Sequence, residues 1–241
     1  ARLVRAENDR RASSVVEGSS ESPQKPLYVI SDEVYKYIVH DEAREARHVH
    51  FATLPGMDAY TLTVSSAGKT FSATGWQIGW LVAPAAIQRN AHRLLPYLQF
   101  CAATPMQAAL ATALKRADAP YEGFATYYHW LREEYRRKRR VLCDALEAAG
   151  LRPLPGQGGY FVLADMAAYA ERIPARYWAE TPAKPAMTAD WAFCRWLAEE
   201  YSLIAIPASP FFSPGPSSAG EDAALSERLV RFAFCKTEPT L

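Results

Sequence analysis

A lysine surrounded by small and hydroxyl residues is the strongest sign of chemistry in this sequence. Lys69 lies in the stretch SSAGKTFSATGWQIGW, residues 65–80, directly after a short apolar run. A lysine held partly out of water at the end of a buried strand can attack an aldehyde and form a Schiff base. The alternative is a structural lysine near a loop. The residues around Lys69 therefore make it a candidate nucleophile.

An acid and a phenol form a second candidate group in ISDEVY, residues 30–35. Asp32 follows an apolar run, where a parallel strand would deliver it to the ligand crevice of an open α/β sheet. Taken alone, Asp32 is equally suited to a helix N-cap or a turn, and Tyr35 to the core or a rim. An electron-sink cofactor needs a lysine for its aldehyde, an acid for its pyridine nitrogen and a donor for its ring oxygen. Lys69, Asp32 and Tyr35 match these three needs.

The elements that must position these residues follow from hydrophobic patterning. Three short apolar runs predict strands in the first half: Leu27–Ile30, Leu62–Val64 and Gly79–Pro84. The pattern then turns helical over Ala85–Arg93, over Met106–Ala117 and over a long helix from about Tyr121 to Ala149 that Gly150 ends. Beyond Gly150 we expect a strand at Tyr160–Ala164, a helix at Ala189–Tyr201, the segment Leu203–Ile206 and a final strand at Leu229–Phe234.

This succession predicts an α/β protein with two domains and a boundary inside the long helix. We divide the chain into residues 1–130 and 131–241. The opening residues have a helical pattern, and the Ser/Glu/Pro-rich stretch 13–26 is interpreted as an insertion into a surface loop.

Composition excludes several classes of function. The 241 residues are 49% hydrophobic and 22% charged, and the formal net charge of +1 gives no electrostatic case for a nucleic-acid or membrane partner. The basic run Arg136–Arg140 is interpreted as a solvated helix face. The four cysteines form no CxxC pair and we identify no clustered histidines, so we predict no metal site, no disulfide framework and a reducing compartment. We expect a small-molecule substrate.

The uncharged stretch Leu94–Leu114 is long enough to raise the question of a membrane span. It contains Pro96, Pro105 and two glutamines, so we interpret it as buried protein instead. Two alternatives stay open for it: ordinary domain core, or a subunit interface that includes Tyr97 and Phe100.

Taken together, the motifs resemble the fold-type I pyridoxal-phosphate (PLP) enzymes, and among them the class I aminotransferases of the kynurenine aminotransferase (cysteine-S-conjugate β-lyase) group. The matching stretches occur in family order and cover nearly the whole chain after Pro26: ISDEVY, LPGM at 54–57, TLTVSSAGKTFSATGWQIGW, GGYFVLADM at 158–166, IPASPFF at 206–212 and RFAFCK at 231–236. The resemblance implies an α/β fold composed of the C-terminal part of the large, mostly parallel-sheet domain and the small C-terminal domain.

The resemblance also implies a role for individual residues. Lys69 resembles the lysine that forms the Schiff base and moves the substrate Cα proton. Asp32 resembles the partner of the pyridinium nitrogen, Tyr35 the phenol bonded to the ring oxygen, and Ser66 a hydroxyl that contacts the phosphate. Arg231 resembles the arginine that holds the substrate α-carboxylate in bidentate fashion, although without the resemblance it would be a surface strand residue.

Two departures from the family pattern affect these expectations. Where the family usually has Arg or Lys against the phosphate, this chain has Gln77, so we expect weaker cofactor retention. The family's N-terminal segment is also absent, so we expect a C-terminal fragment with little independent activity.

For the intact parent, we expect transamination of an aromatic or sulfur-containing L-amino acid with a 2-oxo acid, in a cytoplasmic or mitochondrial homodimer. The alternatives are β-elimination from cysteine conjugates and a non-catalytic fragment that binds PLP weakly.

Overall fold

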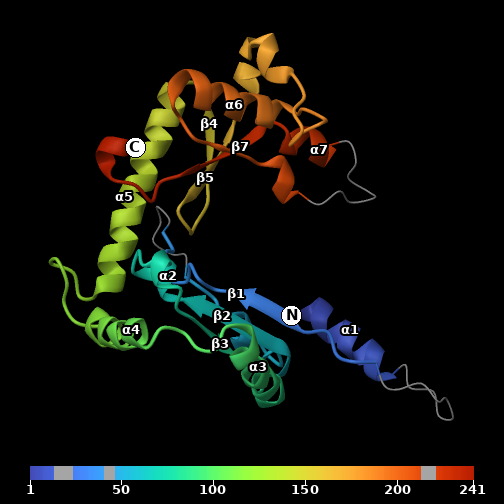
Figure 1. Ribbon diagram of the computed structural model, residues 1–241, viewed down its shortest axis with the longest axis vertical. Helices are drawn as coiled ribbons and strands as arrows, with labels where there is room; N and C mark the ends of the chain where they lie inside the picture. Colours follow the sequence, from blue (N-terminus) through green and yellow to red (C-terminus); the bar gives the residue numbers. More distant parts are fainter. Residues whose placement is uncertain (14–23, 41–46, 213–220) are drawn as a thin grey trace. The chain divides into compact units, whose positions relative to one another are not determined.

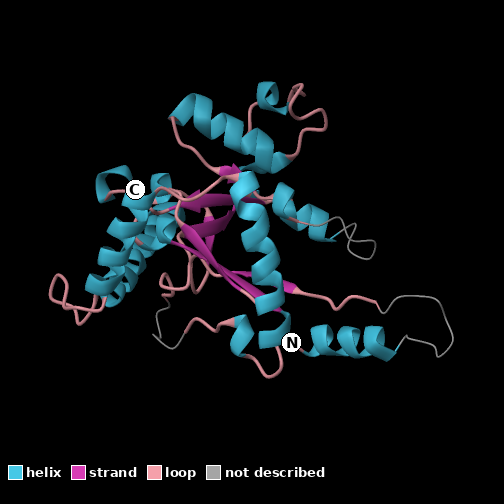
Figure 2. Ribbon diagram, turned by 60° about the horizontal axis from the view of Figure 1, so that its bottom comes forward, coloured by secondary structure: helices cyan, strands magenta, loops and turns pink. Residues whose placement is uncertain are grey.

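The computed structural model of the chain describes residues 1–13, 24–40, 47–212 and 221–241, with only the backbone described for 221–223. Most of the predicted insertion at 13–26 therefore lies outside the described residues. The chain divides into two compact units, described separately below: the described residues within 1–39 and 46–131, and those within 40–45 and 132–241. Each unit combines one sheet with helices (Figure 2). None of the helices described is long and apolar enough to cross a membrane.

The sheet of the first unit has the order β1-β2-β3. Its strands are β1 (Val29–Asp32), β2 (Thr61–Ser66) and β3 (Gly79–Val82), so the three apolar runs correctly predicted strands. β1 and β2 are parallel, and their arrows in Figure 1 point to the same edge, whereas β3 is antiparallel to β2. The two parallel strands thus deliver the residues that follow them to one side of the sheet.

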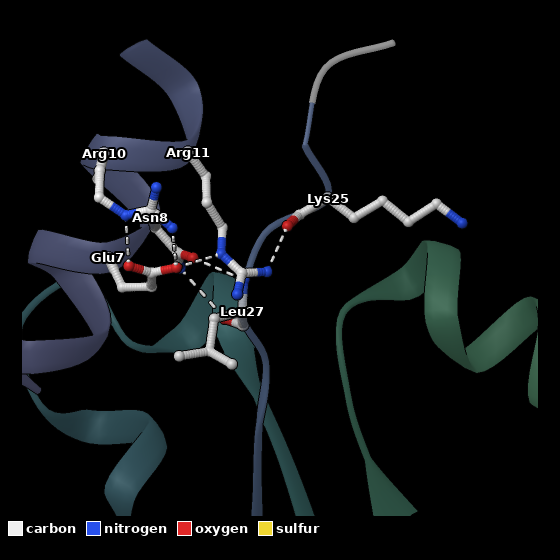
Figure 3. A network of polar contacts seen from close by, with 6 residues as sticks. All are labelled: Glu7, Asn8, Arg10, Arg11, Lys25 and Leu27. Atoms are coloured by element: carbon white, nitrogen blue, oxygen red, sulfur yellow. Dashed lines mark hydrogen bonds and ion pairs between the residues drawn. The ribbon is translucent and has the colours of Figure 1, made fainter. Parts of the chain in front are cut away.

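The opening helix, α1 (Arg2–Ser13), confirms the helical pattern of the first residues and is tied to the chain that enters β1. The buried Asn8 side chain donates to the Leu27 carbonyl at 3.2 Å and accepts from the Leu27 N–H at 2.6 Å, as Figure 3 shows. The Arg11 guanidinium donates to the Lys25 carbonyl at 2.9 Å. These bonds satisfy backbone groups just before the strand begins, so they help to fix where β1 starts.

The helices of the first unit include a short turn and two longer segments: α2 (Ala67–Thr70), α3 (Ala85–Leu98) and α4 (Thr104–Ala117). A buried cluster is formed by Ala67 of α2, Leu110 of α4 and Ile78.

The interpretation of Leu94–Leu114 as buried protein is wrong for this chain, in which Leu110 is the only buried residue of the stretch. Tyr97 is 89% exposed and Phe100 is 79% exposed, and α3 has no buried residue. Apolar content alone does not bury a helix, because burial also requires a neighbouring element to pack against it.

The long helix α5 (Tyr127–Ala148) begins later than the sequence pattern indicated. Residues 121–124 form a tight turn instead, in which Tyr121 and Phe124 exchange both backbone hydrogen bonds and Gly123 adopts a φ of +80°. This left-handed conformation ends any continuous helix, and Thr126 then caps α5 by accepting from the His129 N–H. The boundary between the two units lies inside α5, after Leu131.

The sheet of the second unit has the order β4-β5-β7-β6 and is antiparallel throughout. Its strands are β4 (Arg152–Pro155), β5 (Phe161–Asp165), β6 (Ile206–Pro207) and β7 (Leu229–Ala233). β5 and β7 match two predicted strands, but β4 was missed because two of its four residues are prolines. Prolines are tolerated there because β4 is an edge strand.

Helices complete the second unit. α6 (Ala189–Tyr201) has the predicted bounds, whereas α7 (Glu221–Ser226) was not among the predicted elements. The core of this unit is largely apolar and includes Val162, Ala164, Phe193, Val230 and Phe234. His40 joins this unit: its ring hydrogen-bonds to the Gly159 carbonyl at 2.7 Å.

Short 3-10 helices occur in both units, at Phe51–Thr53, Asp58–Tyr60, Thr74–Trp76, Ala167–Arg172, Ala175–Trp178, Ser209–Phe211 and Glu238–Thr240.

Candidate functional site

The carboxyl end of β1 carries the predicted acid and phenol. Asp32 is the last residue of the strand and is exposed, and its Oδ1 accepts a 3.3 Å hydrogen bond from the Val34 N–H. Tyr35 lies in the turn that follows and is partly buried. The carboxylate thus points into solvent at the strand end, with most of its hydrogen-bonding capacity left for a ligand.

Lys69 lies on α2, which starts immediately after β2. Ser66 caps this helical turn, because its Oγ accepts from the Gly68 N–H at 2.9 Å. A Cβ atom on Gly68 would lie 3.1 Å from Ser66 Oγ and 3.2 Å from Thr74 Cα, so a larger residue here would push against both neighbours. The Ala67 N–H donates to the Ile78 carbonyl at 3.0 Å. These two bonds anchor the start of the turn that carries the partly exposed Lys69.

Gln77 precedes β3 and adopts a left-handed conformation with a φ of +54°. Its side chain is exposed, and its Nε2 donates to the Thr74 carbonyl at 2.8 Å. Because β3 is antiparallel to β2 with Gly79 opposite Ser66, the start of β3 lies at the same edge of the sheet as the end of β2.

The strand register relates these positions to one another. Asp32 on β1 is opposite Val64 on β2, two residues before Ser66, and Lys69 follows in the next helical turn. All five residues predicted for the cofactor therefore belong to the first unit, at or next to one edge of its sheet. All five are partly or fully exposed strand-end and turn residues, as a ligand-binding edge requires.

Arg231 belongs to the second unit, in the middle of β7, opposite Leu163 and Ile206. Its guanidinium carbon lies 4.2 Å from the centre of the Phe161 ring and 4.3 Å from that of Phe211. Its Nε is buried and has no hydrogen-bond partner in the part of the chain that the structure describes. The alternative of a plain surface strand residue does not hold, because the partly buried side chain lies against two aromatic rings. Its role in binding substrate stays a prediction.

Three side chains of the first unit form a cluster that was not predicted from the sequence. Glu33, next to Asp32, is 4% exposed and hydrogen-bonds to both His48 and His50. Burial by itself raises the pKa of Glu33, but hydrogen bonds from the two histidines and from Ser31 outweigh it and lower this pKa to about 2. The prediction of no clustered histidines is thus incorrect. The His-x-His spacing of HVH, residues 48–50, was the available signal.

Comparison with known proteins gives the family of the chain. Residues 21–232 match the family model for aminotransferase class I and II. The chain belongs to this family. It is 36% identical over 213 residues to a kynurenine–oxoglutarate transaminase of Dictyostelium discoideum, covering 88% of this chain and 46% of that protein. It is 33% identical to human kynurenine–oxoglutarate transaminase 1, covering 90% of this chain and 48% of that protein.

Solved structures of aminotransferases agree with this assignment. The N-succinyldiaminopimelate aminotransferase of Mycobacterium tuberculosis matches with a TM-score of 0.69 and 33% identity, over 89% of this chain and 47% of that one. A methionine aminotransferase of Escherichia coli matches with a TM-score of 0.67 and 34% identity, over 88% and 47%. The chain spans about half the length of the curated relatives it matches. Over that half it has the α/β fold of the aminotransferases.

Proposed function

We propose that the protein acts in PLP-dependent transfer of an amino group from an aromatic or sulfur-containing L-amino acid to a 2-oxo acid. The observation that carries this proposal is the arrangement of Asp32, Ser66 and Lys69 on two adjacent parallel strand ends of one sheet. The donor preference rests on similarity to the kynurenine transaminases and to the methionine aminotransferase. We further propose that the chain represents the C-terminal part of the large domain, residues 1–130, and the small domain, residues 131–241.

The residues at this edge suit PLP chemically. They supply an amine, a carboxylate, a phenol, a hydroxyl and a neutral amide, which together match an aldehyde, a pyridine nitrogen, a ring oxygen and a phosphate. When bound, PLP supplies an aldehyde that condenses with amines and a pyridine ring that accepts electrons from the bonds of the substrate Cα. The exposed position of Asp32 and the turn that carries Lys69 are compatible with this ligand.

Each side chain has a distinct task in this proposal. The Asp32 carboxylate keeps a proton on the pyridine nitrogen, and the Tyr35 phenol donates to the ring oxygen. Ser66 Oγ accepts from the Gly68 N–H, so its own hydroxyl proton remains to be donated to a phosphate oxygen. Gln77 donates from a neutral amide, which forms a weaker bond to phosphate than a charged donor would.

The substrate needs a base and an anchor. With PLP bound, Lys69 Nζ would be placed to take the proton from the substrate Cα and to give it back. Arg231 binds the substrate α-carboxylate. The rings of Phe161 and Phe211 hold its guanidinium plane, and its unpartnered Nε adds a donor for that carboxylate.

A PLP titration tests the proposal. PLP added to the full-length parent at micromolar concentration is expected to give the visible absorption band of PLP bound covalently to lysine. The chain itself should need a higher PLP concentration, because it spans about half the length of its relatives and has Gln77 in place of a charged phosphate partner. Lys69→Ala should abolish this band, whereas Lys115→Ala, which removes an exposed lysine of α4, should leave it unchanged. A band that persists in Lys69→Ala, or that never forms with the wild-type protein or its full-length parent, would contradict the assignment.

Product analysis separates the alternatives. β-Elimination from cysteine conjugates shares the same removal of the Cα proton by Lys69, but it yields ammonia and pyruvate instead of a new amino acid. A chain that binds PLP only weakly and forms neither set of products would support the third alternative, a non-catalytic fragment.

We also propose that two copies of the protein associate through α3. Its exposed apolar side chains include Leu94, Tyr97 and Leu98, and Phe100 follows directly after the helix. Such a contiguous apolar surface is typical of a protein–protein interface. Light scattering after gel filtration is expected to report a dimer that Tyr97→Asp converts to a monomer, and a wild-type monomer would contradict the proposal.

A further inference from the structure

Three side chains with metal-binding groups converge beside the end of β1. The Oε2 atom of Glu33 lies 3.0 Å from His48 Nε2, and His50 Nδ1 bonds to the same oxygen. These three atoms all lie within 4.8 Å of one another. The two imidazole rings are edge-to-face, with their centres 4.7 Å apart. Two nitrogens and one oxygen therefore surround a single point, although Glu33 is fifteen or more residues from either histidine.

The carboxylate at this point is held in a fixed orientation. The other oxygen of Glu33, Oε1, accepts from the Ser31 hydroxyl at 2.9 Å and from the Phe51 N–H at 3.2 Å. These two bonds direct Oε2 toward the histidines. Outer partners of this kind orient the ligands of protein metal sites and increase their affinity.

The donor types select among metal ions. Ca²⁺ and Mg²⁺ prefer oxygen ligands throughout, whereas two imidazole nitrogens and one carboxylate oxygen suit Zn²⁺. The histidine side chains are 24% and 45% exposed, whereas Glu33 is 3% exposed. The buried carboxylate thus closes the inner side of the cluster, and the solvent side remains open for a water as fourth ligand.

We propose that Glu33 Oε2, His48 Nε2 and His50 Nδ1 bind one Zn²⁺ ion. Each imidazole then carries its proton on the other ring nitrogen. The ion replaces the two hydrogen bonds that now join the histidines to Glu33. Because Ser31 and Glu33 flank Asp32, a metal here clamps the end of β1 to the segment before residue 51. Binding of the ion does not depend on PLP.

Metal titration of the chelator-treated protein tests this assignment. Zn²⁺ titrated calorimetrically in the absence of PLP is expected to bind with one equivalent per chain. His48→Gln and His50→Gln should each weaken binding by about a hundredfold or more, because loss of an outer partner alone costs about 10–100-fold. Ser31→Ala, which removes only such a partner, should weaken binding by about tenfold. His92→Gln, an exposed histidine of α3, is the matched control and should bind as the wild type does.

Two further measurements distinguish binding at this cluster from binding at unrelated surface groups. Co²⁺ in place of Zn²⁺ should give the intense visible bands of a four- or five-coordinate ion, and His50→Gln should lose them. Excess Zn²⁺ should raise the melting temperature of the wild type but not that of His48→Gln. The proposal is overturned if no stoichiometric binding occurs, or if His92→Gln weakens binding as much as the two cluster variants do.

Discussion

Asp32 and Asp165 end a strand in the first and second unit, respectively, and their local structures are alike. Each carboxylate accepts a hydrogen bond from the backbone N–H two residues further on, Val34 for Asp32 and Ala167 for Asp165. Their wider surroundings differ. Asp165 is buried and also accepts from Arg152 at 3.0 Å and Arg228 at 2.6 Å. Asp32 is exposed, and no arginine or lysine of the described residues forms a salt bridge with it.

The difference shows how one local motif serves two purposes. The two arginines satisfy the remaining oxygen of Asp165, so this carboxylate joins strand β4 and residue 228 to β5. Asp32 keeps its capacity for an external cation, such as a protonated ring nitrogen. The same residue type at the same place in a strand is therefore structural in one unit and a ligand-binding candidate in the other. The following predictions test this contrast.

The largest effect is expected for Asp32→Asn. An amide cannot keep a proton on the pyridine nitrogen, so the rate of 2-oxo acid formation by the PLP-loaded enzyme should fall about a hundredfold to a thousandfold. The free energy of unfolding should change by less than about 0.5 kcal/mol, because the side chain is exposed. Steady-state kinetics and denaturant unfolding measure the two quantities. Asp58→Asn, another exposed acid of this unit, is the control; equal rate losses in both variants would remove the special role of Asp32.

The opposite pattern is expected for Asp165→Asn. Loss of the charge weakens the bonds to two arginines and should cost about 2 kcal/mol of unfolding free energy, a modest value because both arginines remain largely in water. Absorbance of bound PLP should not change. Asp144→Asn, on the exposed side of α5, should have little effect in the same urea titration. If Asp165→Asn has the same free energy of unfolding as the wild type, the buried carboxylate does not stabilise the sheet.

The pH dependence of stability should follow Asp165 in the acid range. Burial tends to raise the pKa of this carboxyl, but the bonds from the Ala167 N–H, Arg228 and Arg152 lower it below its ordinary value of 3.8. A carboxyl with a lowered folded-state pKa stabilises the protein fully above its ordinary pKa, and this contribution is lost as the pH falls below that value. Unfolding midpoints should be measured between about pH 6 and pH 3, a range that spans the ordinary carboxyl pKa. Over this range the midpoint should decline less steeply in Asp165→Asn than in the wild type. Parallel curves would contradict this.

The smallest effect is expected for Gln77→Arg. A guanidinium in place of the amide adds a charge-assisted bond to the cofactor phosphate, so PLP should bind about tenfold more tightly. Spectroscopic titration gives the Kd, and Gln88→Arg on the exposed part of α3 controls for the added charge alone. Equal gains in both variants would show that Gln77 does not face the phosphate.

Much of the fold could be predicted because local patterns determine local structure. The apolar runs that became β1, β2 and β3 and the periodic stretch that became α6 were recognisable without any tertiary information. Strand β4 could not be recognised in this way, because its prolines are tolerated only at the edge of a sheet, and the sequence does not show which strand lies there. The late start of α5 could not be recognised either, because Gly123 interrupts the helical pattern only when its φ is positive. The roles of Lys69, Asp32, Tyr35, Ser66, Gln77 and Arg231 stay predictions.

The sequence by itself determined the family and the order of its motifs, because those depend on residue type and spacing along the chain. Tertiary structure decided which groups meet. It brings Glu33 to the histidines at 48 and 50, places Arg231 between two rings, and leaves the apolar side chains of α3 exposed. Such encounters depend on strand register and helix packing between distant segments, and these are properties that no local stretch of sequence contains.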